Sequence, residues 1–347
     1  MLESRRFLPL AEAQAPFFVG VDLGGTMVKV GVVDDQGRAL SWTCVKTEPQ
    51  RGPEDGTRRM AQAVFQAIDE ARLKPAQVAR VGLGSPGTMD IPAGLILEPH
   101  NLPGWINFPI RDTLARECGL PVTFANDAAA AAYGEFWIGS GKGLPSMVLF
   151  TLGTGIGCGI IVGERSIDGD HSHGAECGHI IIDSRDDARL CPCGQPGHLE
   201  AYAGALAVVK RTREALDAGR TSSLAARIEA GEILTPLLLS QEAETGDELS
   251  LEIILDTARY LGVGVVSVMH TIDPSGVVLG GAMNFGCHET AVGRRFLQCV
   301  REEVRRRVFP VLANRTKVDY AALGGDAGYI GAAGLARAEH RRLTTDH

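Results

Sequence analysis

The sequence predicts an α/β fold of two similar lobes with a cleft between them. The chain has 347 residues, which at roughly 150 residues per domain corresponds to about two domains. Two segments, 17–33 and 147–162, share one pattern, in which an apolar run, a glycine-rich turn and a second apolar run follow each other. Between them lie segments with apolar residues at helical spacing. Strands that alternate with helices are typical of α/β proteins.

Each predicted element follows from a local pattern. Residues 17–33 are predicted to form two strands, because apolar runs flank a Gly-Gly turn. A helix is predicted over residues 57–73. Met60, Val64 and Ile68 recur there at every fourth position, which places them on one helix face. The other predicted elements are strands at 78–84, 120–124 and 277–281, a second hairpin at 147–162, and helices at 128–133, 251–269 and about 325–338.

The two glycine turns divide the chain into related halves, because Leu23-Gly24-Gly25-Thr26 in the first half has a counterpart in Leu152-Gly153-Thr154-Gly155 in the second. A small lobe is therefore expected over 17–140, with a C-terminal helix at about 325–340 packing back on it. A large lobe is expected over 141–324. Residues 1–16 are expected to fray, as chain ends often do. The alternative is that the halves are unrelated, since any α/β protein contains several strand–glycine–strand pieces.

Composition excludes several classes of protein. Apolar residues make up 45% and charged residues 22%, which is typical of a folded globular chain and not of a disordered one. The formal net charge of −8 repels a phosphate backbone, so no nucleic-acid partner is expected. Eight cysteines are too few for a disulfide scaffold, and no apolar run reaches the ~20 residues of a membrane span. The sequence predicts a reduced, cytoplasmic protein without a membrane partner.

The two glycine turns are candidate phosphate sites. Backbone N–H groups in a tight turn form a concave anion site, and glycine lets phosphate oxygens approach closely. The candidate residues are Gly24, Gly25, Thr26, Gly153, Thr154, Gly155 and Gly157. Asp22 precedes the first turn, and a carboxylate beside phosphate needs a cation between them, so Asp22 is a candidate Mg²⁺ ligand. The alternative is that Asp22 caps the turn.

A second candidate site is Asn126-Asp127, which follows a predicted strand and precedes a predicted helix. Ligands of α/β folds bind where strands end and helices begin. Asp127 is suited to accept the proton of a substrate hydroxyl, and Asn126 to hydrogen-bond a neighbouring hydroxyl. The alternative is that the pair only caps the helix, which Asn and Asp often do.

A third candidate site is a group of four metal-binding side chains. They are His179, Cys191, Cys193 and His198. Two nitrogen and two sulfur ligands suit a closed tetrahedral Zn²⁺ site, whereas a disulfide within Cys-x-Cys is strained. A structural Zn²⁺ would order this loop and aim Glu176, His179 and Glu200 at a polyhydroxylated ligand. The alternative is a turn rich in Gly, Cys and His that binds no metal.

These segments occur together with several others in one order along the chain. They are Asp22-Leu23-Gly24-Gly25-Thr26, Gly84-Ser85-Pro86-Gly87, Asn101-Leu102-Pro103-Gly104-Trp105, Ala125-Asn126-Asp127, Leu152-Gly153-Thr154-Gly155-Ile156-Gly157, Glu176-Cys177-Gly178-His179, Cys191–Glu200 and Leu279-Gly280-Gly281. Each piece alone is weakly specific, but their ordered combination, from about residue 17 to 335, is highly specific. It resembles the ROK family (repressors, open reading frames and sugar kinases), and within it the glucokinases.

The resemblance implies an actin-like (ribonuclease H-like) two-lobe fold, with ATP and Mg²⁺ in the cleft and phosphorylation of a hexose hydroxyl. It implies that Asp127 is the base and that Gly280 and Gly281 lie by the nucleoside. The residues it assigns to the sugar are Gly87, Asn101, Asn126, Asp127, Glu176, His179 and Glu200. Two residues depart from the family pattern: His198 stands where Cys is usual, and Met27 where Lys is common. Because histidine is an acceptable Zn²⁺ ligand, a structural Zn²⁺ is still expected.

The implied activity is that of an ATP-dependent glucokinase of glycolysis, acting as a homodimer. Two alternatives stay open. The sugar-facing residues suit hydroxyls in general, so N-acetylmannosamine, fructose, mannose or allose could replace glucose, and polyphosphate could replace ATP. The family also contains sugar-responsive repressors. The segment 1–21, before Asp22, is too short for the usual DNA-binding module, which leaves a sugar-binding regulator without kinase activity as the second alternative.

Overall fold

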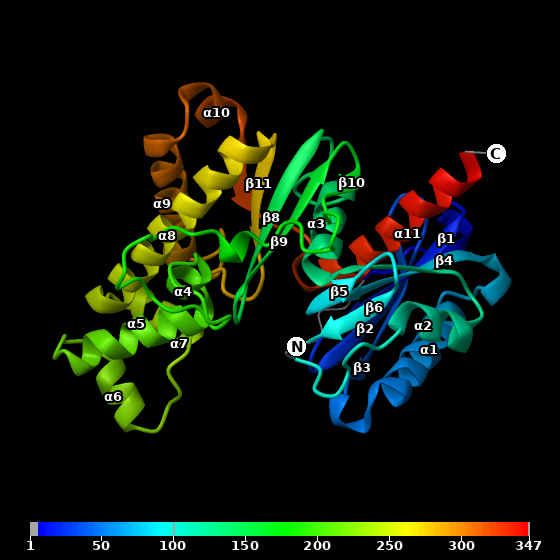
Figure 1. Cartoon of the computed structure of the whole chain (residues 1–347), viewed down its shortest axis with the longest axis horizontal. Coiled ribbons are helices and arrows are strands. Elements are labelled where there is room, and N and C mark those ends of the chain that lie inside the picture. The colour runs from blue at the N-terminus through cyan, green and yellow to red at the C-terminus, as the bar shows by residue number, and fades with distance from the viewer. Residues whose placement is uncertain (1–5, 100, 346–347) are drawn as a thin grey trace. The chain divides into compact units, whose positions relative to one another are not determined.

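The computed structural model describes residues 6–99 and 101–345. By its internal contacts the chain divides into two compact units, and Figure 1 labels their elements where there is room. Unit 1 comprises Met1–Ser146, Gly159–Ala175 and Ala322–His347, and unit 2 comprises Met147–Cys158 and Glu176–Ala321. The described residues form two five-stranded sheets and one two-stranded sheet, so the predicted α/β class is confirmed.

The first sheet has the strand order β3-β2-β1-β4-β7. β1 (Phe17–Leu23) pairs antiparallel with β2 (Met27–Val33), which pairs antiparallel with β3 (Ala39–Lys46). On its other side β1 pairs parallel with β4 (Val78–Ser85), and β4 pairs parallel with β7 (Val122–Asn126). The carboxyl ends of β1, β4 and β7 therefore meet at one end of the sheet.

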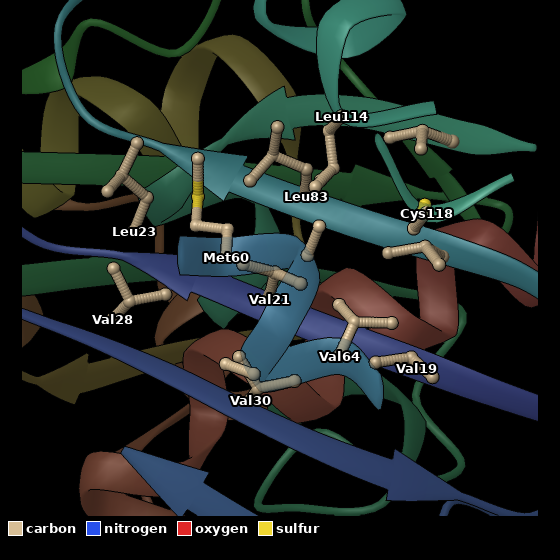
Figure 2. Packing of buried hydrophobic residues seen from close by; sticks show 14 of the residues in the cluster. Val19, Val21, Leu23, Val28, Val30, Met60, Val64, Leu83, Leu114 and Cys118 are labelled. Atoms are coloured by element: carbon tan, nitrogen blue, oxygen red, sulfur yellow. The ribbon is translucent and has the colours of Figure 1, made fainter. Parts of the chain in front are cut away.

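A hydrophobic core lies between one face of this sheet and the helices α1 (Pro53–Glu70) and α2 (Ile110–Cys118). Successive side chains of a strand point to opposite faces, so alternate residues of β1 enter this core. Figure 2 shows Val19 and Val21 of β1 in one cluster with Met60 of α1. The predicted 57–73 helix is confirmed as α1, which begins at Pro53, one turn earlier than expected.

The opposite face of the sheet carries α11 (Ala327–Thr345), which also packs against α3 (Asp127–Trp137). A Cβ at Gly20 of β1 would lie 1.7 Å from the Tyr329 carbonyl oxygen. A Cβ at Gly82 of β4 would lie 1.8 Å from the Ala332 carbonyl oxygen. Glycine at these two strand positions is what allows the backbone of α11 to approach the sheet.

The second sheet repeats the arrangement of the first, with the order β10-β9-β8-β11-β12. In each sheet a glycine turn joins two neighbouring strands, and the first of them pairs in parallel with a later strand. That later strand pairs in parallel with the last strand of the sheet. This shared topology agrees with the repeat expected from the two glycine turns. The strands are β8 (Ser146–Leu152), β9 (Ile156–Val162), β10 (Arg165–Ser166), β11 (Gly276–Gly280) and β12 (Lys317–Tyr320).

The remaining elements complete the two units. Unit 1 also contains the hairpin β5 (Thr88–Asp90) and β6 (Leu95–Glu98). The helices of unit 2 are α4 (Glu200–Ala203), α5 (Ala205–Asp217), α6 (Leu224–Glu229), α7 (Pro236–Glu244), α8 (Glu248–Ile272), α9 (Ala291–Arg307) and α10 (Pro310–Arg315). None of the helices within residues 6–99 and 101–345 has both the length and the apolar character needed to cross a bilayer.

Hydrogen bonds hold the described parts of both end segments. Of the segment 1–16, which is expected to fray, residues 1–5 lie outside the described part. Leu8 N–H donates to Ala39 O at 2.8 Å, and Gln14 N–H donates to Asp34 Oδ2 at 3.1 Å. These bonds hold the segment that leads into β1. The C-terminal helix continues beyond residue 340, where Arg341 Nη2 donates to Asp35 Oδ2 at 2.6 Å.

The division into units differs from the boundary expected at residue 140. Gly159–Ala175, expected in the larger part, belongs to unit 1. The physical reason is close packing of β9 on α3: a Cβ at Gly159 would lie 2.5 Å from Ala132 Cβ and 2.6 Å from Ala128 O. The whole of β8 lies between these two segments in the sequence. A local sequence pattern therefore does not predict that they pack together.

Candidate functional site

The candidate residues of unit 1 gather at the carboxyl ends of β1, β4 and β7. Asp22 lies opposite Gly84 in the first pair of strands, and Ser85 lies opposite Asn126 in the second. Neighbouring strands are about 4.8 Å apart, so the backbones of Asp22 and Asn126 are separated by about 10 Å across the sheet. A Cβ at Gly84 would lie 3.7 Å from Asp127 Cα. The structure thus brings the two predicted carboxylates, Asp22 and Asp127, to one end of a single sheet.

Asn126 caps the start of α3. Its Oδ1 accepts hydrogen bonds from the N–H groups of Ala128 at 2.8 Å and Ala129 at 3.2 Å, which the helix itself leaves without partners. Asp127 is the first residue of the helix, and its Oδ1 also accepts from Ala128 N–H at 2.8 Å. The helix-cap alternative is therefore confirmed for Asn126. Asp127 thus lies at the positive end of the helix dipole, where an acidic residue stabilises the helix.

The first glycine turn closes with a hydrogen bond from Gly24 N–H to Met27 O at 3.0 Å. Thr47, which follows β3, supports the turn: its Oγ1 donates to Gly24 O at 2.6 Å and its N–H to Thr26 O at 2.9 Å. Neither Gly25 N–H nor Thr26 N–H donates a hydrogen bond within the described part of the chain. These two backbone amides are the ones that a phosphate oxygen could use.

Asn101 lies beside this turn, because a Cβ at Gly25 would be 3.1 Å from Asn101 Cβ. Gly87, which is predicted to contact the sugar, packs on the segment that leads to Asn101. Its φ is +92°, and a Cβ there would lie 2.6 Å from Pro99 Cα. Steric constraints alone therefore explain why position 87 is glycine, whether or not this residue contacts substrate.

Lys29 is a residue of this region that none of the sequence motifs includes. Its Nζ lies 3.6 Å from Asp22 Oδ2. A Cβ at Gly328 would lie 2.5 Å from Asp22 Cγ, so the start of α11 packs against the same carboxylate. Burial raises the pKa of Asp22, while the charge of Lys29 opposes that rise. In the sequence, Lys29 could have been found as the single charged residue within the apolar strand β2. Lys29 lies two positions after Met27 and on the same face of β2, so a cation stands near the turn although Met27 carries none.

Asp22 has the properties of a Mg²⁺ ligand. Its side chain is 19% exposed, and Mg²⁺ is usually held by one or two carboxylates together with water and substrate phosphates. The turn-capping alternative has no support among the hydrogen bonds of the described residues, because the Gly24 N–H that closes the turn goes to a backbone carbonyl.

The second glycine turn, in unit 2, also closes through the N–H of its first glycine. Gly153 N–H donates to Gly155 O at 3.0 Å, as Gly24 N–H donates to Met27 O in the first turn. The N–H groups of Thr154 and Gly155 are not donors to other described residues. Gly157 lies inside β9 and not in the turn. In each turn, the two amides directly after the first glycine therefore have no acceptor among the described residues.

Gly280 and Gly281 lie next to this second turn. Gly280 ends β11 and is opposite Thr151 of β8. Gly281 has φ +91°, and a Cβ there would lie 2.3 Å from the carbonyl oxygen of Leu152, the residue before the turn. The structure thus brings together the glycine pair and the glycine turn that are predicted to bind one nucleotide.

The four predicted zinc ligands come together in unit 2, with all their ligand atoms within 4.8 Å of one another. The Nδ1 atoms of His179 and His198 are 3.2 Å apart. Cys193 Sγ lies 3.2 Å from His198 Nδ1, and Cys191 Sγ lies 3.8 Å from His179 Nδ1. Zinc bonds of about 2.0–2.3 Å place tetrahedral ligand atoms about 3.3–3.8 Å apart. The donor set and its spacing therefore fit a Zn²⁺ ion.

Two further observations support this fit. Burial, and next the neighbouring His179, lower the pKa of His198, which favours the neutral imidazole that a metal requires. His179 enters the cluster through Nδ1, and its Nε2 lies 4.0 Å from Glu176 Oε2. A metal on Nδ1 would fix the proton on Nε2. Nε2 of His179 would then be a hydrogen-bond donor, and the neighbouring Glu176 carboxylate a hydrogen-bond acceptor.

Glu200 connects this cluster to the second glycine turn. Its Oε2 accepts from Ile156 N–H at 2.8 Å, and its Oε1 lies 3.8 Å from Cys191 Sγ. Gly178 approaches the same residue, because a Cβ at Gly178 would lie 2.2 Å from Ile156 O. The sequence predicts Glu200 only as a sugar ligand, and no local pattern indicates its contact with the turn.

Replacing Glu200 with alanine is expected to lower the free energy of unfolding by about 1–3 kcal/mol. The reason is that Ile156, which is 4% exposed, would keep a buried N–H without an acceptor. Glu200→Gln is the matched control, because its amide oxygen can still accept this hydrogen bond. Urea unfolding of both variants measures the difference, and equal losses of stability would contradict a role for the hydrogen bond.

Comparison with known proteins gives matches over nearly the whole chain. The model of the ROK family matches residues 18–339. The glucokinase of Halalkalibacterium halodurans is 30% identical over 327 residues, which cover 94% of this chain and 97% of the relative. The solved ROK hexokinase of Thermus thermophilus is 32% identical with a TM-score of 0.79, covering 94% of this chain and 99% of that one. A ROK family glucokinase from Streptomyces griseus, solved in complex with glucose and AMPPNP, is 32% identical with a TM-score of 0.72, covering 93% and 99%.

Proposed function

The chain belongs to the ROK family, and on that basis we propose that it is an ATP-dependent hexose kinase that converts glucose and ATP to glucose 6-phosphate and ADP. It has the actin-like α/β fold of the family's sugar kinases. One structural observation carries the proposal: Asp127, at a helix start, lies at the same end of one sheet as Asp22 and the first glycine turn. Phosphoryl transfer depends mainly on positioning and charge neutralisation, and this end of the sheet supplies groups for both.

In the proposed mechanism, Asp127 orients the 6-hydroxyl of the hexose for in-line attack on the γ-phosphorus of ATP. The bond between hydroxyl oxygen and phosphorus forms while the bond to the β–γ bridging oxygen breaks. Because the transition state is loose, the hydroxyl proton passes to Asp127 late. Asn126 hydrogen-bonds a neighbouring hydroxyl. The other proposed sugar ligands are Gly87, Asn101, Glu176, His179 and Glu200.

The free backbone amides of the two turns are proposed to bind phosphate oxygens. They belong to Gly25, Thr26, Thr154 and Gly155, and the glycines at 24, 153 and 157 keep the surrounding backbone open. Gly280 and Gly281 are proposed to lie by the nucleoside. Asp22 would hold Mg²⁺, which neutralises phosphate charge when bound. The contact of Lys29 with Asp22 holds that carboxylate in place.

We also propose a structural Zn²⁺ on the cluster of His179, Cys191, Cys193 and His198. The spacing of the four ligand atoms supports it. The role of the metal would be to fix the loop and the tautomer of His179, so that Nε2 donates to a sugar hydroxyl and the neighbouring Glu176 accepts from another.

The sugar is tested by measuring ADP release with glucose, mannose, fructose, allose and N-acetylmannosamine. Glucose is expected to give the highest kcat/KM, and ATP is expected to be preferred to polyphosphate. A higher kcat/KM with another hexose would identify that hexose, and not glucose, as the preferred substrate. Binding of glucose without any sugar-dependent turnover would instead favour the sugar-binding regulator.

We further propose that the protein is a cytoplasmic homodimer. Leu190 and Leu206 of unit 2 are 64% and 56% exposed and line one hollow together with Pro192. Exposed apolar side chains that lie together favour a protein partner. Light scattering after size exclusion tests the proposal, which predicts about twice the chain mass of 36.8 kDa.

A further inference from the structure

Unit 1 contains a cavity of about 830 Å³ beside β7. Its walls are residues 122–125 of β7, residues 163–166 around the start of β10, and residues from 335 to 342 of α11. This volume lies in the range of small-molecule sites, about 300–1,000 Å³. None of the residues proposed above to contact glucose, ATP or a metal is among those lining it. The cavity is therefore distinct from the proposed kinase site.

The lining of this cavity is cationic, although the chain as a whole carries a net charge of −8. Five arginines face three carboxylates. They are Arg111, Arg165, Arg337, Arg341 and Arg342, against Glu164, Asp168 and Glu339. A hollow lined by an excess of one charge concentrates ligands of the opposite charge. Where carboxylates outside the lining do not neutralise this excess, the cavity favours an anion.

Part of this positive charge is held in place, and part has no partner. Arg337 Nε donates to Asp35 Oδ1 at 2.8 Å, and its guanidinium lies 5.1 Å from the Trp137 ring. Arg111 Nε pairs with Asp112 Oδ1 at 2.8 Å, and Arg341 Nη2 pairs with Asp35 Oδ2 at 2.6 Å. Arg165 and Arg342, in contrast, form no ion pair with any residue in the described ranges. These two side chains are free to take the anion.

The cavity also offers groups that suit hydroxyls. The carboxylates of Glu164 and Asp168 are acceptors, and the ring of Tyr133 is a buried aromatic surface. β7 is the outermost strand of its sheet, so one row of its backbone N–H and C=O groups has no strand partner. A ligand that combines a phosphate with several hydroxyls would use both the arginines and these polar groups.

We propose that this cavity binds a sugar phosphate, with Arg165 and Arg342 on the phosphate group, and that the ligand slows the kinase. The effect would pass along β7, because Asn126 and Asp127 continue this strand directly from the cavity wall. The inhibitory part of the proposal rests on the proposed function. The binding part rests on the cavity alone.

Binding is tested by calorimetric titration of glucose 6-phosphate into the protein already saturated with glucose and AMPPNP. One further molecule per chain is expected to bind. The double variant Arg165→Ala/Arg342→Ala is expected to bind it at least about tenfold more weakly, because two charge-assisted hydrogen-bonding groups are lost. Arg305→Ala/Arg315→Ala is the matched control, since it removes two exposed arginines of unit 2 and should leave binding unchanged. No binding by the saturated protein, or equal binding by the cavity variant, would overturn the proposal.

A second arm separates a sugar phosphate from a simple anion. Inorganic phosphate and sulfate are titrated in the same way and are expected to bind at least about tenfold more weakly than glucose 6-phosphate. Equal affinities would overturn recognition of the sugar.

The kinetic arm compares initial rates with and without added glucose 6-phosphate. The cavity variant should keep the kcat and KM of the unmodified protein but lose inhibition that is non-competitive with glucose. Non-competitive inhibition that persists in the variant would overturn the regulatory link. If the protein shows no turnover, the kinase assignment fails, and the titration still tests the cavity.

Discussion

Asp127→Asn is expected to lower kcat by about 10²–10⁴-fold, which is the usual contribution of a positioned general base. Asparagine keeps the shape of the side chain and the cap of α3 by Asn126, but it cannot take the hydroxyl proton. Glucose should therefore still bind with an affinity close to that of the unmodified protein. Steady-state ADP release gives kcat, and calorimetry gives the affinity for glucose.

The control for this experiment is Asp69→Asn, which makes the same chemical change at an exposed position in α1. It should leave kcat unchanged. A turnover number within tenfold of the original in Asp127→Asn would remove Asp127 from the role of base. Loss of glucose binding together with turnover would show that the substitution acts through the structure of the site.

The second large effect is expected at the proposed zinc site. His198→Ala leaves three of the four ligands of a structural site, and its zinc content is expected to fall from about one equivalent to less than about 0.1. The glucose affinity should fall with it, by about 10–100-fold, because His179 loses the bond that fixes its Nε2 proton. Elemental analysis of the purified protein measures zinc, and calorimetry measures glucose binding.

Two variants make this result specific. His198→Cys restores four ligands and should retain zinc. His173→Ala removes an exposed histidine that is not part of the cluster and should have no effect on zinc content. If His198→Ala keeps its full zinc content, His198 is not a ligand and the proposed donor set is wrong.

The elements of the proposed site were largely predictable because their signals are local. Each glycine turn is indicated by the apolar runs on both sides, and the structure places β1 and β2, and β8 and β9, around these turns. The four candidate metal ligands all lie in the short segment 179–198, so one ordered loop is enough to bring them together. Asn126 was predictable as a helix cap because Asn is strongly preferred at the residue that precedes a helix.

Contacts between distant segments were not predictable from these patterns. The start of α11, near the opposite end of the chain, packs against the Asp22 carboxylate, since a Cβ at Gly328 would lie 2.5 Å from Asp22 Cγ. Glu200 of α4 accepts from Ile156 N–H of β9, although the loop that carries the metal-binding residues separates them in the sequence. In both cases the partner depends on how elements pack, and no spacing in the sequence records it.

The sequence by itself determined the α/β class, the two glycine turns, the four candidate metal ligands and the carboxylate that follows β7. These depend on hydrophobic periodicity, turn chemistry and ligand chemistry, which act over short stretches of chain. Only the tertiary structure decided that residues 159–175 join unit 1, that Glu200 holds the second turn, and that β7, β10 and α11 enclose a cationic cavity. These features arise from close packing between remote segments, because a buried contact forms wherever two surfaces fit, regardless of their separation along the chain.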